Sequence, residues 1–489
     1  MESRHHVVSR RLATQAMFFT GMGLCIAPGI ALAQSEAFDP ARPFTWQTLL
    51  RNARELSTQP FTAPAVAVQA ATEFDAFGAL AYGKAKRFGK SIRLFPAARN
   101  IAEKPVELHH LANGMARKLI DQTGMFVGEE NRQPAGFRVM RDTGDADWLA
   151  FLGASYFRTS GQENQYGLSA RAVAIDTALA DEEEFPAFTA FWIEEHGPDH
   201  VQIYALLDGP SLTGACSFDC RLTDDGVEQD AQISLFLRRS VERLGIAPLT
   251  SMFWYDQKGP KADWRPEVHD SDGLVVHFGS GERIWRPLVV PTSARTTSFK
   301  ADNLRGFGLL QRDRHFEDYQ DDGAFYNRRP SLWVKPLSDW GKGQVILYEM
   351  PTESETQDNV VAFWVADEAP KPGKQHDVAY RLHWTSEEPD ADVQARCVDS
   401  FEGPAGRPGA PGDKNARKYI FDFQGPTLLG KTRQSGITAI TDLPSEAVSA
   451  LAAYPVVGKV ATWRVMLDLR QTVARNPEFR FIWPTEPRY

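Results

Sequence analysis

Apolar and polar residues alternate along several stretches of this chain, and this two-residue period is the feature that most restricts its fold. The apolar positions of four such stretches are Val378, Tyr380, Leu382 and Trp384; Tyr419, Phe421 and Phe423; Trp463, Val465, Leu467 and Leu469; and Phe479, Phe481 and Trp483. Because successive side chains of a strand point to opposite faces, the rhythm predicts half-buried antiparallel strands. Gly, Pro and Asp turns separate these stretches. We therefore expect a mainly β protein built from β-sandwiches.

Helical spacing is rare in this sequence. The clearest case is near the N-terminus, where the apolar residues are Trp46, Leu49, Leu50, Ala53 and Leu56. These positions lie on one face of a helix with 3.6 residues per turn. We expect one short amphipathic helix there.

The chain has 489 residues, a length that normally divides into two or more domains. The alternation breaks at Glu387-Glu388-Pro389-Asp390, and a Gly- and Pro-rich loop follows at 403–412. We therefore predict a large β-sandwich over residues 34–390. Residues 395–489 are predicted to form a smaller immunoglobulin-like β-sandwich, since a segment of about 100 residues with several short strands suits that fold.

The first 33 residues predict export. Arg10 and Arg11 precede an almost uncharged stretch, 16–33, that ends in Ala31-Leu32-Ala33. This is the pattern of a cleavable signal peptide, and the paired arginines favour the twin-arginine (Tat) route over an ordinary Sec signal. A membrane anchor ranks below both, because it needs about 20 apolar residues and glycines interrupt this run. We expect a periplasmic protein without a membrane anchor, beginning near Gln34.

Charge and cysteine content exclude several functions. Without residues 1–33 the chain keeps 51 Lys and Arg against 62 Asp and Glu, a formal charge of −11. Such a protein is a poor partner for nucleic acid or anionic lipid. Cys216 and Cys220 would lie about 13 Å apart on a strand, too far for a disulfide, so buried free thiols are expected. No zinc-type cysteine pairing exists, and we predict neither a metal site nor a cofactor.

Carboxylates beside aromatic residues are the most informative signals for chemistry. Asp270 lies in His269-Asp270-Ser271-Asp272-Gly273, downstream of Trp254, and Asp358 lies between the strand-like segments 344–350 and 360–365. Acidic pairs act on glycosidic bonds, and aromatic rings stack on sugars. The plainer interpretations are an Asp-Gly turn at Asp270 and a solvated acidic loop at Asp358. The residues alone predict no more than a saccharide site.

Long blocks of the sequence add a family resemblance. They are 151–158 (FLGASYFR), 165–171 (QYGLSAR), 184–192, 244–248 (LGIAP), 306–311 (GFGLLQ), 329–334 (RPSLWV) and 340–343 (WGKG). In these blocks the chain resembles the periplasmic osmoregulated glucan biosynthesis proteins G and D (OpgG and OpgD). The twin-arginine signal looks more like the D branch. The resemblance extends over essentially the whole predicted mature chain.

The resemblance implies a fold and an activity. The family fold is a large N-terminal β-sandwich of the galactose-mutarotase type joined to a smaller immunoglobulin-like domain. The implied activity is hydrolysis of β-1,2-glucan within the chain, with inversion at the anomeric carbon. Asp358 matches the general acid, Asp270 the general base, and Tyr326 a tyrosine of the proton path. For substrate binding we expect His269, Arg329, Trp333, Thr356 and Trp254.

The local sequences agree with this division of roles. Asp358 is flanked by apolar strands, which predicts a raised pKa, whereas Asp270 lies in a polar turn and is expected to stay ionised. In the family the base acts through a relay of water and a substrate hydroxyl. The separation of the two carboxyl groups therefore need not lie within the usual inverting range of about 6.5 to 9.5 Å.

Two other functions remain open at this stage. A site that excludes water and presents a sugar hydroxyl would join or cyclise glucan chains instead of hydrolysing them. A glucan-binding scaffold would need neither carboxylate. The resemblance implies a longer loop with aromatic residues in relatives of the D type, which can help close the site, and it leaves a homodimer possible. The counterpart here, 401–416, is short and has Phe401 as its only aromatic residue, so both closure and dimerisation stay open.

Overall fold

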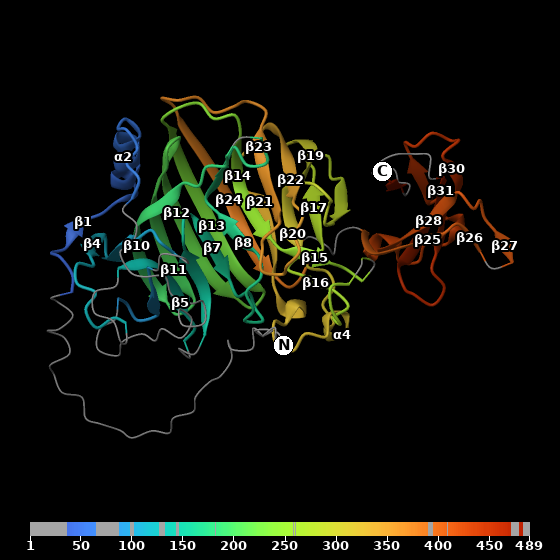
Figure 1. The fold of residues 1–489 in the computed structure, drawn as a ribbon, viewed down its shortest axis with the longest axis horizontal. Coiled ribbons are helices and arrows are strands. Elements are labelled where there is room, and N and C mark those ends of the chain that lie inside the picture. The colour runs from blue at the N-terminus through green and yellow to red at the C-terminus, as the bar shows by residue number, and fades with distance from the viewer. Residues whose placement is uncertain are drawn as a thin grey trace, which may run out of the picture. The chain divides into compact units, whose positions relative to one another are not determined.

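The computed structural model describes residues 37–64, 88–97, 102–126, 133–142, 146–180, 182–257, 259, 261–389, 395–407, 409–470 and 479–482. The chain divides into two compact units between Glu387 and Glu388 (Figure 1). The predicted export signal, 1–33, and the predicted start of the mature chain, Gln34, lie outside the described residues. Among those residues, no helix combines the length and the apolar character that a membrane crossing requires.

The first unit contains a twelve-stranded sheet. Its spatial order is β1 (Arg42–Pro43), β4 (Met115–Lys118), β3 (Glu107–Ala112), β10 (Ala187–Gly197), β11 (His200–Asp208), β12 (Leu212–Thr223), β13 (Gly226–Leu237), β24 (Gln375–Thr385), β21 (Ser331–Pro336), β20 (Gly306–Leu310), β17 (Gly273–His277) and β18 (Arg283–Pro287). Neighbours are antiparallel except β3 and β10. In β24, Tyr380, Leu382 and Trp384 are buried and the residues between them are half-buried, so the alternation predicted there is confirmed.

A ten-stranded sheet accompanies it. The order is β19 (Arg295–Asp302), β22 (Lys342–Glu349), β23 (Val360–Ala366), β14 (Leu244–Ser251), β8 (Ser169–Arg171), β7 (Tyr156–Thr159), β6 (Asp147–Leu152), β5 (Pro134–Met140) and β2 (Ile92–Pro96), with β9 (Val173–Ile175) also paired to β14. A separate pair joins β15 (Phe253–Tyr255) to β16 (Val268–His269). The short helices α4 (Phe316–Tyr319) and η1 (Tyr326–Arg328) lie between β20 and β21.

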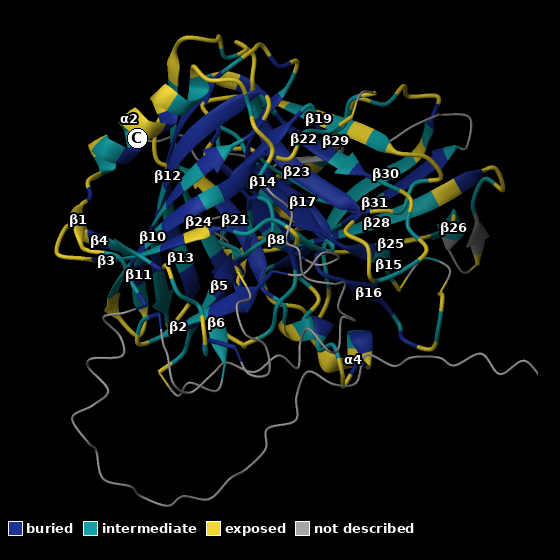
Figure 2. Ribbon diagram, turned by 60° about the vertical axis from the view of Figure 1, so that its left-hand side comes forward, coloured by how far each residue is buried: buried dark blue, intermediate teal, exposed yellow. Residues whose placement is uncertain are grey.

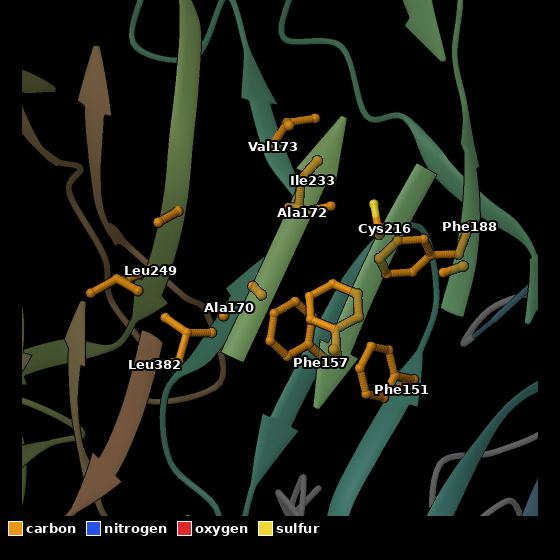
Figure 3. Close-up of a cluster of buried hydrophobic side chains, with 14 of the residues drawn as sticks. Phe151, Phe157, Ala170, Ala172, Val173, Phe188, Cys216, Ile233, Leu249 and Leu382 are labelled. Atoms are coloured by element: carbon orange, nitrogen blue, oxygen red, sulfur yellow. The ribbon is translucent and has the colours of Figure 1, made fainter. Parts of the chain in front are cut away.

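The two large sheets pack face to face around one core (Figures 2 and 3). Phe157 on β7 lies 5.1 Å from Phe218 on β12, and Phe151 on β6 lies 6.1 Å from Phe188 on β10, measured between ring centroids. Burying each such ring stabilises the fold by about 1.5–3 kcal/mol. The protein is therefore mainly β with a large sandwich, as the alternation predicts.

The predicted helix is present as α2 (Trp46–Ser57). Thr45 caps its N-terminus, because the Thr45 hydroxyl accepts a hydrogen bond from the Thr48 amide at 3.2 Å. Leu49 and Ala53 are fully buried, and the Thr213 hydroxyl of β12 donates to the Ala53 carbonyl at 2.6 Å. The apolar face thus packs on the outer side of the twelve-stranded sheet.

The second unit has a four-stranded antiparallel sheet. Its order is β25 (Arg396–Pro404), β28 (Ala416–Gln424), β31 (Thr462–Arg470) and β30 (Val448–Pro455). Two further strand pairs are β26 (Gly406–Arg407) with β27 (Ala410–Pro411) and β29 (Thr438–Thr441) with β32 (Phe479–Ile482). The unit also contains the short 3-10 helices η3 (Pro426–Leu428) and η4 (Arg433–Ser435). Trp483, counted in the alternation, lies outside those residues.

One strand of this unit buries a charge. Along β28 the aromatic residues are only half-buried, whereas Asp422 is fully buried. The Arg464 guanidinium of β31 donates two hydrogen bonds to its carboxylate, at 2.7 and 2.9 Å. A buried charge must be paired, and β31 supplies the partner.

Cys216 and Cys220 are as expected, because both are buried on β12 as thiols outside any disulfide. The Cys397 thiol donates to the Asp399 carbonyl at 3.5 Å. Burial raises the pKa of the Cys220 thiol to about 12, so this thiol stays protonated and inert.

Candidate active site

One short backbone segment holds both candidate carboxylates, although Asp270 and Asp358 are far apart in the sequence. The Asp270 amide donates to the Met252 carbonyl at 2.8 Å, between β14 and β15. Next to Asp358, the Asn359 amide donates to the Ser251 carbonyl at 3.1 Å. The Asn359 side-chain oxygen also accepts from the Phe253 amide at 2.9 Å. The predicted pair is thereby brought to one place, with its backbone fixed on both sides.

Asp270 lies in a closed, charged environment. Its side chain is buried, and the Arg329 guanidinium donates to its Oδ1 in an ion pair. Arg329 also lies over the Tyr326 ring, 3.9 Å from the centroid. An ion pair requires the carboxylate form of Asp270, and this form is the one that can accept a proton.

Asp358 has the opposite character. Its side chain is exposed, yet enough protein surrounds it that loss of hydration raises its pKa to about 6. The negative charge of Asp270 raises this pKa further, whereas Arg158, Arg171 and Arg329 lower it. The nearby positive charges do not outweigh the other two causes. Asp358 therefore keeps a proton in a fraction of molecules near neutral pH and remains open to solvent.

Tyr326 is fully buried beside Asp270. Its hydroxyl donates to the Glu355 carboxylate at 2.6 Å. Burial, with the charges of Asp270 and Glu355, raises the pKa of the phenol well above its ordinary value. The preceding residue, Phe325, adopts a left-handed backbone with φ 47°, which is unusual for a bulky side chain. The Tyr326 ring lies in the interior directly after this turn.

Arg265 connects the segments around this tyrosine. Its guanidinium contacts three carboxylates: Asp263 at 2.6 Å, Asp321 at 2.8 Å and Glu355 at 2.8 Å. Asp321 in turn accepts the amides of Gly323 and Ala324. A single cation thus holds the segment before β16, the loop before η1 and the loop that carries Asp358.

Not every residue predicted to bind substrate lies on a surface. His269 is fully buried and stacks on Phe253, with ring centroids 5.4 Å apart. Trp333 on β21 is 2% exposed and packs against Val275 of β17 and Leu310 of β20. Neither ring presents a face to a sugar. Both side chains belong to the interior that supports the site.

The other three residues predicted to bind substrate are Arg329, Thr356 and Trp254. Arg329 forms an ion pair with Asp270. Thr356 is exposed in the loop that carries Asp358, and its hydroxyl lies 2.8 Å from the Ser354 hydroxyl. Trp254 is half-buried on β15, 5.2 Å from the Tyr255 ring. Thr356 and Trp254 therefore keep accessible surface near the two acids.

The comparisons with known proteins decide the family. A sequence profile described as "Periplasmic glucan biosynthesis protein, MdoG" matches residues 44–485. The chain belongs to the MdoG family. The resemblance predicted from the sequence blocks is confirmed.

Proteins similar to this MdoG-family chain carry names of the D type. "Glucans biosynthesis protein D 2" of Ralstonia nicotianae is 42% identical over 460 residues, covering 88% of this chain and 84% of that protein. "Glucans biosynthesis protein D" of Stenotrophomonas maltophilia is 37% identical over 493 residues, covering 96% and 92%. Among solved structures, a galactose mutarotase related enzyme from Lactobacillus acidophilus aligns at 11% identity and a TM-score of 0.23, covering 58% of this chain and 99% of that chain.

Sequence reasoning did not identify several residues of the site as such. Arg158 and Arg171, on neighbouring strands β7 and β8, act electrostatically on Asp358. The register pairs Tyr156 with Arg171. Strand alternation shows which residues share a face but not what they face across the sheet. Arg265 and Glu355 stand among many other charged residues in the sequence, and only the fold reveals that they meet.

Proposed function

We propose that this protein is a periplasmic glycoside hydrolase that cleaves β-1,2-glucan within the chain, with anomeric inversion, as part of osmoregulated glucan biosynthesis. The names of its relatives support the glucan pathway. One observation supports the chemistry: the segments that carry the two carboxyl groups are both anchored to Ser251–Phe253, and one carboxyl group is ion-paired while the other has a pKa of about 6. Inverting hydrolysis requires a base and an acid of this kind.

Each carboxyl group has a definite task in this proposal. Asp358 donates its proton to the glycosidic oxygen as the bond to the anomeric carbon breaks. A water attacks the opposite face of that carbon and loses a proton toward Asp270, through water and a substrate hydroxyl. Arg329 holds the Asp270 carboxylate in place. Tyr326 is fully buried and supports the proton path indirectly, because its ring lies beneath Arg329 and its hydroxyl donates to Glu355.

Accessible surface supports the proposed contacts with sugar. Trp254 and Thr356 retain exposure, and Trp264 is 71% exposed in the segment before β16. Aromatic faces stack on the C–H faces of pyranose rings. A glucan chain lying over these residues would reach Asp358 from solvent.

Product masses test the proposal. Purified protein is incubated with linear β-1,2-glucan and the products are analysed by mass spectrometry. Hydrolysis adds one water for every bond cleaved, and NMR of early products shows the inverted anomer. Cyclic products without added water would instead indicate transglycosylation. An unchanged substrate would indicate a scaffold, and either of these outcomes would overturn the proposal.

A further inference from the structure

A second ionic group lies behind the proposed base and has no part in the function proposed above. Glu267 and His269 are 1% and 0% exposed, and Glu267 Oε2 lies 3.4 Å from His269 Nε2. Two ionisable side chains rarely occupy the interior unless they are paired. The pair immediately precedes Asp270 in the chain.

Gln311 fixes which nitrogen of His269 carries hydrogen. The amide nitrogen of Gln311 donates to the carbonyls of His269 and Tyr326, at 3.0 and 3.2 Å. Its oxygen therefore faces His269 Nδ1, at 2.9 Å. A flipped amide would place oxygen against two carbonyl oxygens. Hence Nδ1 is the donor in this contact.

The remaining nitrogen must then share a proton with Glu267. A neutral ring with hydrogen on Nδ1 would direct the lone pair of Nε2 at the Glu267 carboxylate. Burial by itself lowers the pKa of His269, but Glu267, then Asp272 and Asp313, raise it to about 9. The rings of Phe253 and Tyr319 also lie against His269. An imidazolium pairs its charge with the Glu267 carboxylate across the 3.4 Å between Nε2 and Oε2.

We propose that Glu267, His269 and Gln311 form a buried positioning triad that retains one proton and fixes the backbone from which Asp270 and Tyr326 project. The inference rests on the proposed function only in naming those two residues as the groups positioned. Through the Gln311 amide, the triad joins β16 to η1. These are the segments on either side of the ion pair between Asp270 and Arg329.

Loss of the proton would break the connection that the Gln311 amide makes between β16 and η1. If the pair loses its proton, Gln311 oxygen keeps its donor but Nε2 and Glu267 repel each other, so the ring must move. Gln311 then cannot bond both carbonyls at once. The expected consequence is a looser Asp270 and Tyr326 without any change in the surface that faces solvent.

Two variants test the retained proton and the Gln311 hydrogen bonds separately. Glu267→Gln removes the charge that retains the proton. Gln311→Glu keeps an acceptor for Nδ1 but removes both donors to the carbonyls. A matched control is Asp208→Asn, which breaks another mostly buried ion pair, with Arg238 at 2.7 Å, near the end of helix α2. All are measured as full-length mature protein.

Three readouts are measured. Imidazole NMR follows protonation of His269; hydrogen exchange follows residues 267–272 and 324–330; steady-state kinetics on β-1,2-glucan gives kcat and KM. In the wild type the ring should stay protonated to about pH 9. In Glu267→Gln the pKa of the ring should fall below that of the wild type, because only Asp272 and Asp313 then oppose the effect of burial. Gln311→Glu should keep the proton. In both variants the two segments should exchange about tenfold faster, and kcat should fall about tenfold with KM within twofold.

Several results would overturn the triad. One is a wild-type ring that titrates near pH 6.5. Another is unchanged exchange at 267–272 and 324–330 in both variants. Equal losses in Asp208→Asn would reduce the effect to general destabilisation. If the wild type leaves glucan intact, the proposed function fails, but NMR and exchange still decide the triad. If Glu267→Gln does not fold, the wild-type titration and Gln311→Glu remain decisive.

Discussion

The turn that carries Asp270 and the loop that carries Asp358 show how one backbone segment can support two opposite environments. Glu267, His269 and Asp270 are all buried, and each has a charged or polar partner. In the loop between β22 and β23, Thr356 and Asp358 are exposed. Yet both regions bond to Ser251–Phe253. Protonation state can therefore be set by surroundings while position is set by a shared anchor.

The largest expected effect comes from removing either carboxyl group. Asp358→Asn and Asp270→Asn should each lower the hydrolysis rate by about 10²- to 10⁴-fold while glucan still binds. Rates and binding of β-1,2-glucan are measured separately. Glu353→Gln, an exposed change in the same loop, serves as the control and should keep wild-type rates. Wild-type activity in both acid variants would refute the roles of the pair.

An activated substrate sharpens the comparison. A β-1,2-glucan fluoride needs no acid to expel its leaving group, so it should partly rescue Asp358→Asn but not Asp270→Asn. Rescue of the Asp270 variant alone would exchange the two roles.

Breaking the buried ion pair should cost stability as well as activity. Arg329→Met leaves Asp270 without its partner, and losing one member of a buried pair destabilises by about 3–5 kcal/mol. Denaturant unfolding measures this loss. Arg329→Lys keeps the charge but not the planar guanidinium over Tyr326, so a smaller loss is expected. Equal stability of Arg329→Met and the wild type would show that the pair contributes nothing.

The pH profile should report the exposed acid. In the proposed mechanism Asp358 acts as an acid and must be protonated, and its pKa is about 6. Above that pH, kcat/KM should fall about tenfold per unit. In Asp358→Asn this limb should disappear from the residual activity. A profile that stays flat between pH 6 and 8 would contradict the assignment of Asp358 as the acid.

Tyr326→Phe should destabilise the protein less than Arg329→Met does. It removes the hydroxyl that donates to Glu355 at 2.6 Å and leaves the ring beneath Arg329. Loss of a buried hydrogen bond costs about 1–3 kcal/mol, measurable by thermal or denaturant unfolding. Asp272→Asn, which retains one oxygen for the Arg312 and Asp313 amides, should be milder. A greater loss of stability in Asp272→Asn than in Tyr326→Phe would contradict this ranking.

The smallest effect is a gain in stability. The pKa of Asp358 rises from 3.8 to about 6 on folding. Between these values the folded protein binds more protons than the unfolded chain, so stability falls as pH rises through this window and stays lower above it. At pH 7, Asp358→Asn should therefore raise Tm by about 1 °C. At pH 3 the gain should vanish, and a gain of the same size there would point to another cause.

Much of the fold could be predicted from the sequence because it depends on local periodicity. The alternation around Tyr380 and the helical spacing around Leu49 appear as β24 and α2. Asp422 was less accessible to such reasoning. Its pattern marks it as the polar side of a strand, but Arg464 on the next strand allows it to be buried. Pairing between strands follows from register, which single-sequence periodicity does not contain.

In the site, too, local features could be predicted from the sequence, whereas contacts between distant segments could not. Apolar strands on both sides of Asp358 correctly indicated its raised pKa. The blocks around Asp270, Tyr326 and Arg329 contained residues that do meet. The burial of Trp333 could not be predicted from the sequence. An aromatic residue in a strand has the same sequence pattern whether its ring faces a ligand or packs against Val275. Arg265 was missed because its three partners come from three separate segments.

Asn359 has a consequence for how this family can diversify. Its side-chain nitrogen donates to the Met350 carbonyl at 3.0 Å, so the loop between β22 and β23 is closed at its base. Exposed residues farther out, such as Glu353 and Thr356, lie beyond this closure. Natural or engineered variation can therefore reshape the tip while Asp358 keeps its place. Under the proposed function, the preference for glucan chain length or branching could change in this way without rebuilding the support of the acid.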